Sequence, residues 1–195
     1  MKRAIALLEK HNLLKIISDE LDINLEIPHI AYVEVKRPDS KAILFTNVVD
    51  RKNSKKFKEP VLMNVFCNED AVKLFIGDGD KIGSEIESLL KLKPPVTFSE
   101  KLSTLGKLFS LKNTIPKKIK GKGICQEVIK LGADAKLSDL PVIKTWEDDA
   151  GAFITMGQVY TQSLNGELKN LGMYRLQVFP DNTLGMHWQI HKDSN

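Results

Sequence analysis

Three strand-like stretches decide the fold of the second half of this sequence: AFITMGQVYTQ (152–162), MYRLQVF (173–179) and LGMHWQI (184–190). Each is rich in the β-branched, aromatic and other apolar residues that favour strands. Turn signals separate them at Asn165–Gly166 and at Pro180–Asn182, where the residue types favour tight chain reversals. Because no helical pattern intervenes, this half is predicted to form an antiparallel sheet or barrel.

The first half of the sequence mixes helices and strands. Apolar residues at helical spacing predict a helix over 3–20, with a break near His11–Asn12. Asn68 is a candidate helix N-cap, because Glu69 and Asp70 follow it. The predicted strands cover 29–36, 42–48 and 60–67, and the other predicted helices cover 68–77, 84–92 and 99–111. This half is therefore expected to be mixed α/β (α+β).

A change of composition marks a boundary between two domains. Lys, Pro and Gly gather at 112–123, as is typical of a connecting segment. We therefore predict an N-terminal α/β domain over 1–115 and a second domain over 116–195.

Bulk composition is ordinary for a globular protein. The 195 residues carry a net charge of +4 and are 42% hydrophobic. The only two cysteines, Cys67 and Cys125, lie far apart, which argues against a disulfide scaffold and for a reducing compartment. No signal peptide is evident, and no apolar run approaches the roughly 18 residues of a membrane helix. We expect the protein in the cytoplasm.

Basic residues form two runs, at 51–58 and at 112–122. Such runs bind phosphates or an anionic membrane surface, or they are solvated loops with no ligand. A non-catalytic, nucleic-acid-binding module is therefore one alternative function. Phe57 is the only aromatic residue in either run, so stacked bases have almost no platform, and we expect no nucleic-acid partner.

The residues best suited to chemistry lie in the last third of the chain. Asn170 and Arg175 fall within NLGMYR, and the strand predicted after them carries His187, Gln189 and His191 on one face. Asn and His ligate divalent ions, and Arg forms a bidentate fork with a phosphate or a carboxylate. The alternative is that these are turn, rim and surface residues without any ligand.

Other catalytic motifs are missing from the sequence. It has no glycine-rich dinucleotide or P-loop fingerprint and no His/Cys array with zinc spacing. The acidic triplet Glu147–Asp149 is either a cation site or a polar loop, and a polar loop is the simpler interpretation.

Longer motifs run through both halves in a fixed order. The first half carries LLKIISDELDINLEI (13–27), AILFTNV (42–48) and EPVLMNVFCNEDAVKLFIG (59–77). The second half carries LSDLPVIKTWEDDAGAFITMGQVYTQ (137–162), then NLGMYRLQVF (170–179) and MHWQIHKD (186–193). Along essentially the whole chain, these motifs resemble the UbiD family of decarboxylases.

The resemblance implies that 116–195 begins a split β-barrel domain of flavin-reductase type. It implies prenylated FMN, whose phosphate is held through a divalent metal, commonly Mn²⁺, with a monovalent cation such as K⁺ nearby. The implied metal ligands are Asn170 and His191, and the implied catalytic residue is Arg175, beside the reacting carboxylate. The implied cofactor contacts are Met173, Tyr174, Arg175, His187, Trp188, Gln189, Lys192 and Asp193.

The implied activity is non-oxidative decarboxylation of a (poly)prenylated aromatic acid in menaquinone or ubiquinone biosynthesis. Ubiquinone-pathway members often carry Arg at the position of His187, so the sequence 187–195 is more similar to the menaquinone type. The implied partners are this substrate, a flavin prenyltransferase that supplies the cofactor, and further copies in a homo-oligomer. The apolar substrate tail implies peripheral contact with the inner face of the membrane, with the two basic runs as candidate footprints.

Members of this family are much longer than 195 residues. The resemblance places a third metal ligand and the product-protonating acids downstream of Asn195. The 195-residue chain alone is therefore expected to bind flavin poorly and not to decarboxylate. A flavin-binding split-barrel protein without lyase activity is the second alternative.

Overall fold

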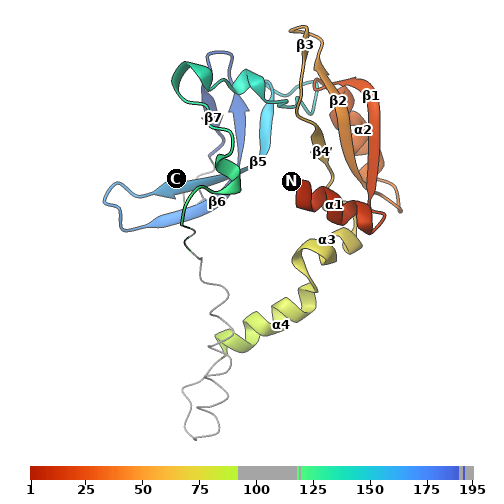
Figure 1. The fold of residues 1–195 in the computed structure, drawn as a ribbon. Coiled ribbons are helices and arrows are strands. Elements are labelled where there is room, and N and C mark those ends of the chain that lie inside the picture. Colours follow the sequence, from red (N-terminus) through yellow and green to blue (C-terminus); the bar gives the residue numbers. More distant parts are fainter. Residues whose placement is uncertain (92–117, 119, 189–190, 192–195) are drawn as a thin grey trace, which may run out of the picture. The chain divides into compact units, whose positions relative to one another are not determined.

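The computed structural model describes residues 1–91, 118, 120–188 and 191 (Figure 1). Contacts group them into two compact units. One unit joins Met1–Phe75 with Ala135–Asn195, and the other is Ile76–Asp134. The boundary predicted between residues 115 and 116 lies outside the described residues, so the division into 1–115 and 116–195 stays a prediction.

The first sheet is a mixed, four-stranded sheet built around one buried strand. β1 (Leu14–Asp22) runs parallel to β2 (Ala42–Asp50), and β3 (Lys55–Lys56) and β4 (Val61–Met63) pair antiparallel with β2. Parallel neighbours need a crossover, which α2 (Glu26–Val35) supplies. The strand predicted over 42–48 is confirmed, whereas the one predicted over 60–67 is found only as β4.

α1 (Lys2–Lys10) ends at the break that the sequence predicts. Asn12 has a φ of 56°, in the left-handed region that Asn tolerates better than most residues. The N–H groups of Asn12 and Leu13 donate to the carbonyls of Glu9 and Leu8, at 3.0 and 2.8 Å. These two bonds form a Schellman C-cap, which satisfies the last carbonyls of the helix and turns the chain towards β1.

Two predictions about the first half are wrong. The helix predicted over 3–20 stops at this cap, and the following residues form β1, because their backbone pairs with β2. The strand predicted over 29–36 is α2. Its β-branched residues are typical of a strand, but Ile27, Ala31 and Glu34 are buried at helical spacing. Packing of that face onto the sheet outweighs strand propensity.

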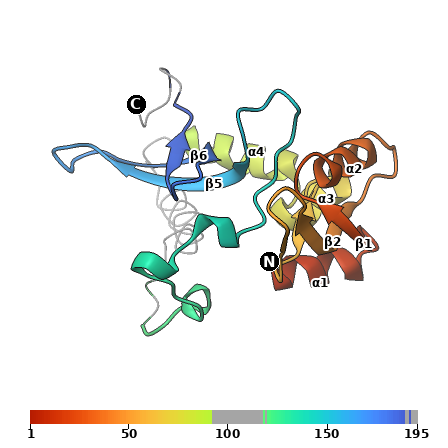
Figure 2. The ribbon, with the colours of Figure 1, turned by 90° about the horizontal axis from the view of Figure 1, so that it is seen from above.

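The main core lies between α2 and the sheet. Its buried members are Ile23, Ile27, Ile43, Phe45, Val48, Phe57 and Ile143. α1 lies on the side of the sheet opposite α2 (Figure 2), and its Leu8 is fully buried. Both faces of the sheet are therefore covered, as the burial of β2 requires.

Residues 135–150 tie the first sheet to the second. Ile143 is a member of the core cluster. Its neighbour Lys144 forms a parallel bridge with Asn24, and the Trp146 ring meets the Tyr32 ring edge-on, with 5.3 Å between the centroids. The connecting segment is thus packed against the first sheet before the chain enters the second.

The antiparallel sheet predicted for the second half is confirmed. β5 (Phe153–Gln162) pairs with β6 (Lys169–Val178), and β6 pairs with β7 (Leu184–Met186). In the two turns, Gly166 has a φ of 76° and Asn182 a φ of 65°. These left-handed conformations are the ones that Gly and Asn favour in tight turns.

Asn68 caps α3 (Glu69–Ile76) as the sequence predicts, since its Oδ1 accepts the Ala71 N–H at 2.9 Å. α4 (Gly79–Leu90) begins ahead of the predicted span 84–92. The reason is Asp78, whose carboxylate accepts the N–H groups of Asp80 and Lys81 and so starts the helix earlier.

Short 3₁₀ helices precede the second sheet: η2 (Ile124–Gln126), η3 (Gly132–Asp134) and η4 (Leu137–Asp139). The helix predicted over 99–111 lies outside the described residues. In the described part of the chain, no helix combines the length and the apolar character needed to cross a membrane.

Replacing Phe45 tests the importance of the main core. Phe45 is fully buried in β2, so Phe45→Ala should lower the free energy of unfolding by about 3–5 kcal/mol. Urea denaturation followed by circular dichroism measures this change. Ile16→Thr is the matched control in β1, because Ile16 is 55% exposed; it should change stability by no more than about 0.5 kcal/mol. Equal effects of the two substitutions would contradict this location of the core.

Candidate functional site

β6 sorts the predicted site residues onto two faces. Side chains alternate along a strand, so Asn170 and Tyr174 share one face of β6, and Met173 and Arg175 share the other. Tyr174 is 4% exposed, whereas Met173 is 62% exposed. The predicted metal ligand Asn170 and the predicted catalytic Arg175 therefore lie on opposite faces of the strand.

The glycine of NLGMYR is needed by its neighbour Tyr174. A β-carbon built on Gly172 would lie 2.5 Å from Cε2 of the Tyr174 ring, well inside van der Waals contact. The Tyr174 ring thus lies against the bare backbone of Gly172. The centroid of the Trp188 ring is 6.3 Å from that of the Tyr174 ring, within the range of favourable aromatic pairs. The structure therefore brings two predicted cofactor contacts, Tyr174 and Trp188, together.

Arg175 is held between a carboxylate and an aromatic ring. Its Nη2 donates to Asp149 Oδ1 at 2.6 Å, and its guanidinium carbon lies 3.7 Å from the centroid of the Phe153 ring. The other oxygen, Asp149 Oδ2, accepts the Trp146 N–H at 3.1 Å. The hydrogen bond from Arg175 is the main cause that lowers the pKa of Asp149, and the hydrogen bond from the Trp146 N–H lowers it further.

Sequence alone did not single out Asp149 or Phe153. Asp149 belonged to an acidic triplet with a simpler interpretation as a polar loop. One usable signal was the hairpin centred on Asn165–Gly166, since a hairpin brings the start of its first strand beside the end of its second. Residues just before or within the start of β5 were therefore candidates for contact with Arg175.

The histidines of the predicted strand are not all arranged as expected. β7 ends at Met186, so the prediction that the strand continues through His187 and Trp188 is wrong. The His187 N–H still donates to Arg175 O at 3.2 Å, which keeps this segment beside β6. Gln189, Lys192 and Asp193 lie outside the described residues. The shared face predicted for His187, Gln189 and His191 rested on that continued strand.

The donors present match part of what a divalent metal requires. An Asn amide oxygen and a His nitrogen are both suitable ligands, but protein sites usually supply at least three. Within the described ranges, no group of three or more His, Cys, Asp or Glu residues could hold a metal ion. Asn170 and His191 would thus be a partial set of ligands.

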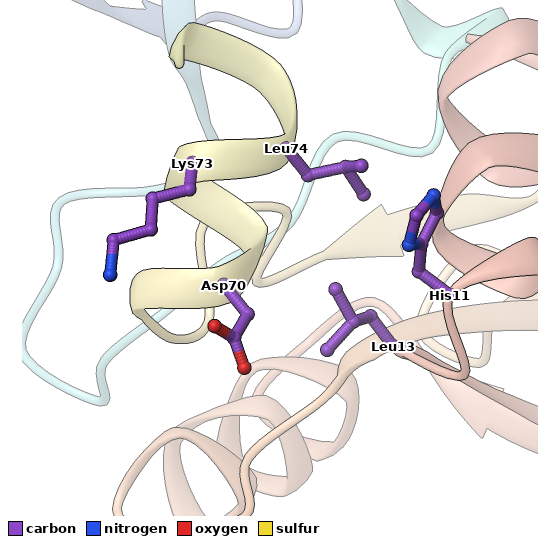
Figure 3. A pocket seen from close by; sticks show the side chains of 5 residues that line it. All are labelled: His11, Leu13, Asp70, Lys73 and Leu74. Atoms are coloured by element: carbon purple, nitrogen blue, oxygen red, sulfur yellow. The ribbon is translucent and has the colours of Figure 1, made fainter. Parts of the chain in front are cut away.

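A surface hollow elsewhere contains none of the predicted site residues among its described lining. It is lined by His11, Leu13, Asp70, Lys73 and Leu74 (Figure 3). In the close-up, His11 and Leu74 face each other, while the Lys73 amine points away. This hollow is therefore separate from the site predicted on β6.

The first basic run is largely neutralised by ion pairs. Arg51 pairs with Glu26, Lys55 with Asp139, and Lys56 with Glu20. Arg51, through its hydrogen bond, lowers the pKa of Glu26. The run therefore offers less free positive charge than its sequence suggests, and the predicted membrane footprint at 51–58 gains no support. Residues 112–117 and 119 of the second run lie outside the described residues.

Comparison with known families identifies the chain. Residues 5–90 match the 3-octaprenyl-4-hydroxybenzoate carboxy-lyase N-terminal domain, and residues 117–195 match the Rift-related domain of the same enzyme. Together the two matches cover most of the chain. The chain therefore belongs to the UbiD family.

Relatives and solved structures are similar to nearly the whole chain. A protein of Helicobacter pylori is 46% identical over 199 residues, covering 100% of this chain and 32% of the relative. The vanillic acid decarboxylase of Sedimentibacter hydroxybenzoicus in closed form has a TM-score of 0.67 at 19% identity, covering 95% of this chain and 36% of that chain.

A third similar protein is a dimeric form of the UbiD-class enzyme HmfF from Pelotomaculum thermopropionicum, solved with prFMN. It has a TM-score of 0.61 at 20% identity, covering 97% of this chain and 38% of that chain. At such identities the two structures support the fold alone. The chain thus spans about a third of the length of the proteins that it matches.

The Arg175–Asp149 pair predicts a measurable pKa change. Arg175→Gln removes the positive charge, so the pKa of Asp149 should rise towards its ordinary value of about 3.9. Carboxyl ¹³C NMR titration measures it. Because pairing depresses this pKa, the pair stabilises the folded state above the unfolded-state value, and that stabilisation is lost as the pH falls through the folded value. An unchanged Asp149 pKa in Arg175→Gln would show that the pair does not form in solution.

Proposed function

We propose that the protein to which this chain belongs is a carboxy-lyase that removes CO₂ from an aromatic acid without oxidation. The observation that carries the proposal is Arg175, fixed by Asp149 and Phe153 on the more exposed face of β6. It lies within the stretch that matches the Rift-related domain of the carboxy-lyase family. In this proposal 1–115 is the N-terminal α/β domain, and 116–195 begins the flavin-binding domain.

Arg175 has the chemistry needed to hold a carboxylate. A guanidinium carries five N–H donors in a planar fork, and the bond to Asp149 uses Nη2. The side chain of Arg175 is 43% exposed, so an incoming acid can reach it. A positive charge held beside the carboxylate orients the bond to be broken and stabilises charge before CO₂ departs.

The proposed cofactor is prenylated FMN, which would supply an acceptor for the electron pair left as the carbon–carbon bond breaks. Support comes from the similar fold of HmfF, solved in complex with prFMN. On this chain the proposed contacts are Met173, Tyr174, Arg175, His187, Trp188, Gln189, Lys192 and Asp193. Of this ring pair, Trp188 is 43% exposed and would be the apolar contact, while the buried Tyr174 ring would support it.

The proposed metal is Mn²⁺, with K⁺ nearby, and Asn170 and His191 would be two of its ligands. A metal bound by these two ligands would neutralise the negative charge of the cofactor phosphate. Asn170 and Arg175 lie on opposite faces of β6, so the proposed metal ligand and the proposed catalytic residue would serve different parts of the site.

The proposed substrate is a (poly)prenylated aromatic acid of quinone biosynthesis. A flavin prenyltransferase would supply the cofactor, and the enzyme would be a homo-oligomer. The proposed substrate is supported by the description of the family, a 3-octaprenyl-4-hydroxybenzoate carboxy-lyase. The similar enzyme from Sedimentibacter hydroxybenzoicus is a vanillic acid decarboxylase, and vanillic acid carries no prenyl chain. Prenylated and simple hydroxybenzoic acids should therefore be compared as substrates.

An assay of CO₂ release tests the function. The full-length protein, reconstituted with prenylated FMN and Mn²⁺, should decarboxylate a prenylated hydroxyaromatic acid. Arg175→Lys keeps the charge but loses the fork, and we expect kcat/KM to fall about 10²- to 10³-fold, as for loss of a key charge-stabilising donor. Lys169→Ala, on the same face of β6, is the matched control and should retain activity. Bound flavin without CO₂ release would favour the flavin-binding alternative.

Metal analysis tests the proposed ligand Asn170. In the full-length protein, Asn170→Ala removes one oxygen donor and should weaken Mn²⁺ binding about tenfold or more, by isothermal titration calorimetry. Gln162→Ala is the control. Gln162 is the last residue of β5, close to the turn of the same hairpin, and the variant should bind Mn²⁺ normally. Wild-type affinity in Asn170→Ala would exclude Asn170 as a ligand.

A further inference from the structure

We propose that Asp149 is a positioning residue of the decarboxylation site: it fixes the Arg175 guanidinium in the orientation that receives the substrate carboxylate. This inference rests on the proposed function, and it adds a residue that acts through Arg175 and not on the substrate itself.

The geometry first points to Asp149. Its Oδ1 lies 2.6 Å from Arg175 Nη2, and its side chain is only 13% exposed, against 43% for Arg175. A charge-assisted bond at this distance is among the stronger hydrogen bonds of proteins. The carboxylate is the more shielded partner, so water competes less for it than in a fully exposed surface pair.

Asp149 is itself held in place. Its Oδ2 accepts the Trp146 N–H at 3.1 Å, and the Trp146 ring packs on Tyr32. On the other side of the loop, Ala150 O accepts Gln177 Nε2 at 3.3 Å. Asp149 is thus anchored through Trp146 to α2 and through its neighbour Ala150 to β6, and this fixed position holds Arg175 in place.

The Phe153 ring completes the support. The guanidinium carbon of Arg175 lies 3.7 Å from the ring centroid, a distance typical of a stacked cation–π contact. The ring limits movement to one plane, and the bond to Asp149 fixes rotation within it. Arg otherwise loses much rotamer freedom when it binds a ligand. Here that freedom is already restricted before the substrate arrives.

The negative charge of Asp149 shows whether it would help by orienting Arg175 or by attracting the substrate. A carboxylate beside Arg175 weakens the pull of the guanidinium on an anionic substrate, so Asp149 does not improve binding of the ground state through charge. Its benefit has to come from orientation, which acts on the chemical step. Removing Asp149 should therefore lower kcat and leave KM unchanged or lower.

The test uses the full-length holoenzyme with prenylated FMN and Mn²⁺. Asp149→Ala should lower kcat about 10- to 100-fold, as expected for a misplaced catalytic group, without raising KM. Asp149→Asn should lie between Asp149→Ala and the wild type, because the two donors bond different oxygens of Asp149 and the NH₂ group that replaces one of these oxygens cannot accept. Asp148→Ala is the matched control, since Asp148 is the exposed neighbour, and it should match the wild type.

Flavin absorbance and the thermal midpoint are measured on every variant. A fall of kcat at full flavin occupancy and an unchanged Tm supports positioning. Unchanged kcat in Asp149→Ala overturns it, as does a rise in KM alone. If flavin occupancy or Tm falls in proportion to kcat in both Asp149→Ala and Asp149→Asn, the role of Asp149 is structural and the inference is wrong. A wild-type enzyme that releases no CO₂ overturns the proposed function as well, whereas the other results leave that function standing.

Discussion

The burial of one side chain, Ile143, is the constraint on which the candidate site depends. Ile143 fills the core between α2 and the first sheet, and its carbonyl accepts the Phe153 N–H at 3.0 Å where β5 begins. Close packing leaves a buried side chain little freedom, and the backbone that carries it is fixed as well. Asp149 and Phe153 follow from that point, so the support of Arg175 originates in the hydrophobic core of the first sheet.

The ion pairs of the chain differ in how strongly they can act. Arg51 and Glu26 are 50% and 41% exposed, and a pair so open to water contributes little to stability. Asp149 is more shielded and has a second hydrogen bond from Trp146. The same chemical pairing therefore neutralises a loop at one place and fixes Arg175, the proposed catalytic residue, at the other. Burial decides between these outcomes, and sequence does not display it.

Local signals predicted much of the fold. The Asn68 cap, the turns at Asn165–Gly166 and Pro180–Asn182, and the strands between them follow from short-range chemistry, and the structure has them. The errors arose where tertiary packing decides: α2 has strand-like residues but is held as a helix by the sheet, and β1 has helix-like spacing but pairs with β2. At the site, NLGMYR pointed to Arg175, whereas Asp149 depends on a contact across 26 residues.

The contact between Gly172 and Tyr174 has a consequence for how this segment can change over time. With a β-carbon position only 2.5 Å from the tyrosine ring, any larger residue at 172 is incompatible with the present ring orientation. A larger side chain at 172 therefore requires the Tyr174 ring to move or to be replaced by a smaller side chain. Replacing Tyr174 by a smaller residue would in turn leave Trp188 without its aromatic neighbour. Substitutions at 172 and at 174 are therefore expected to depend on each other.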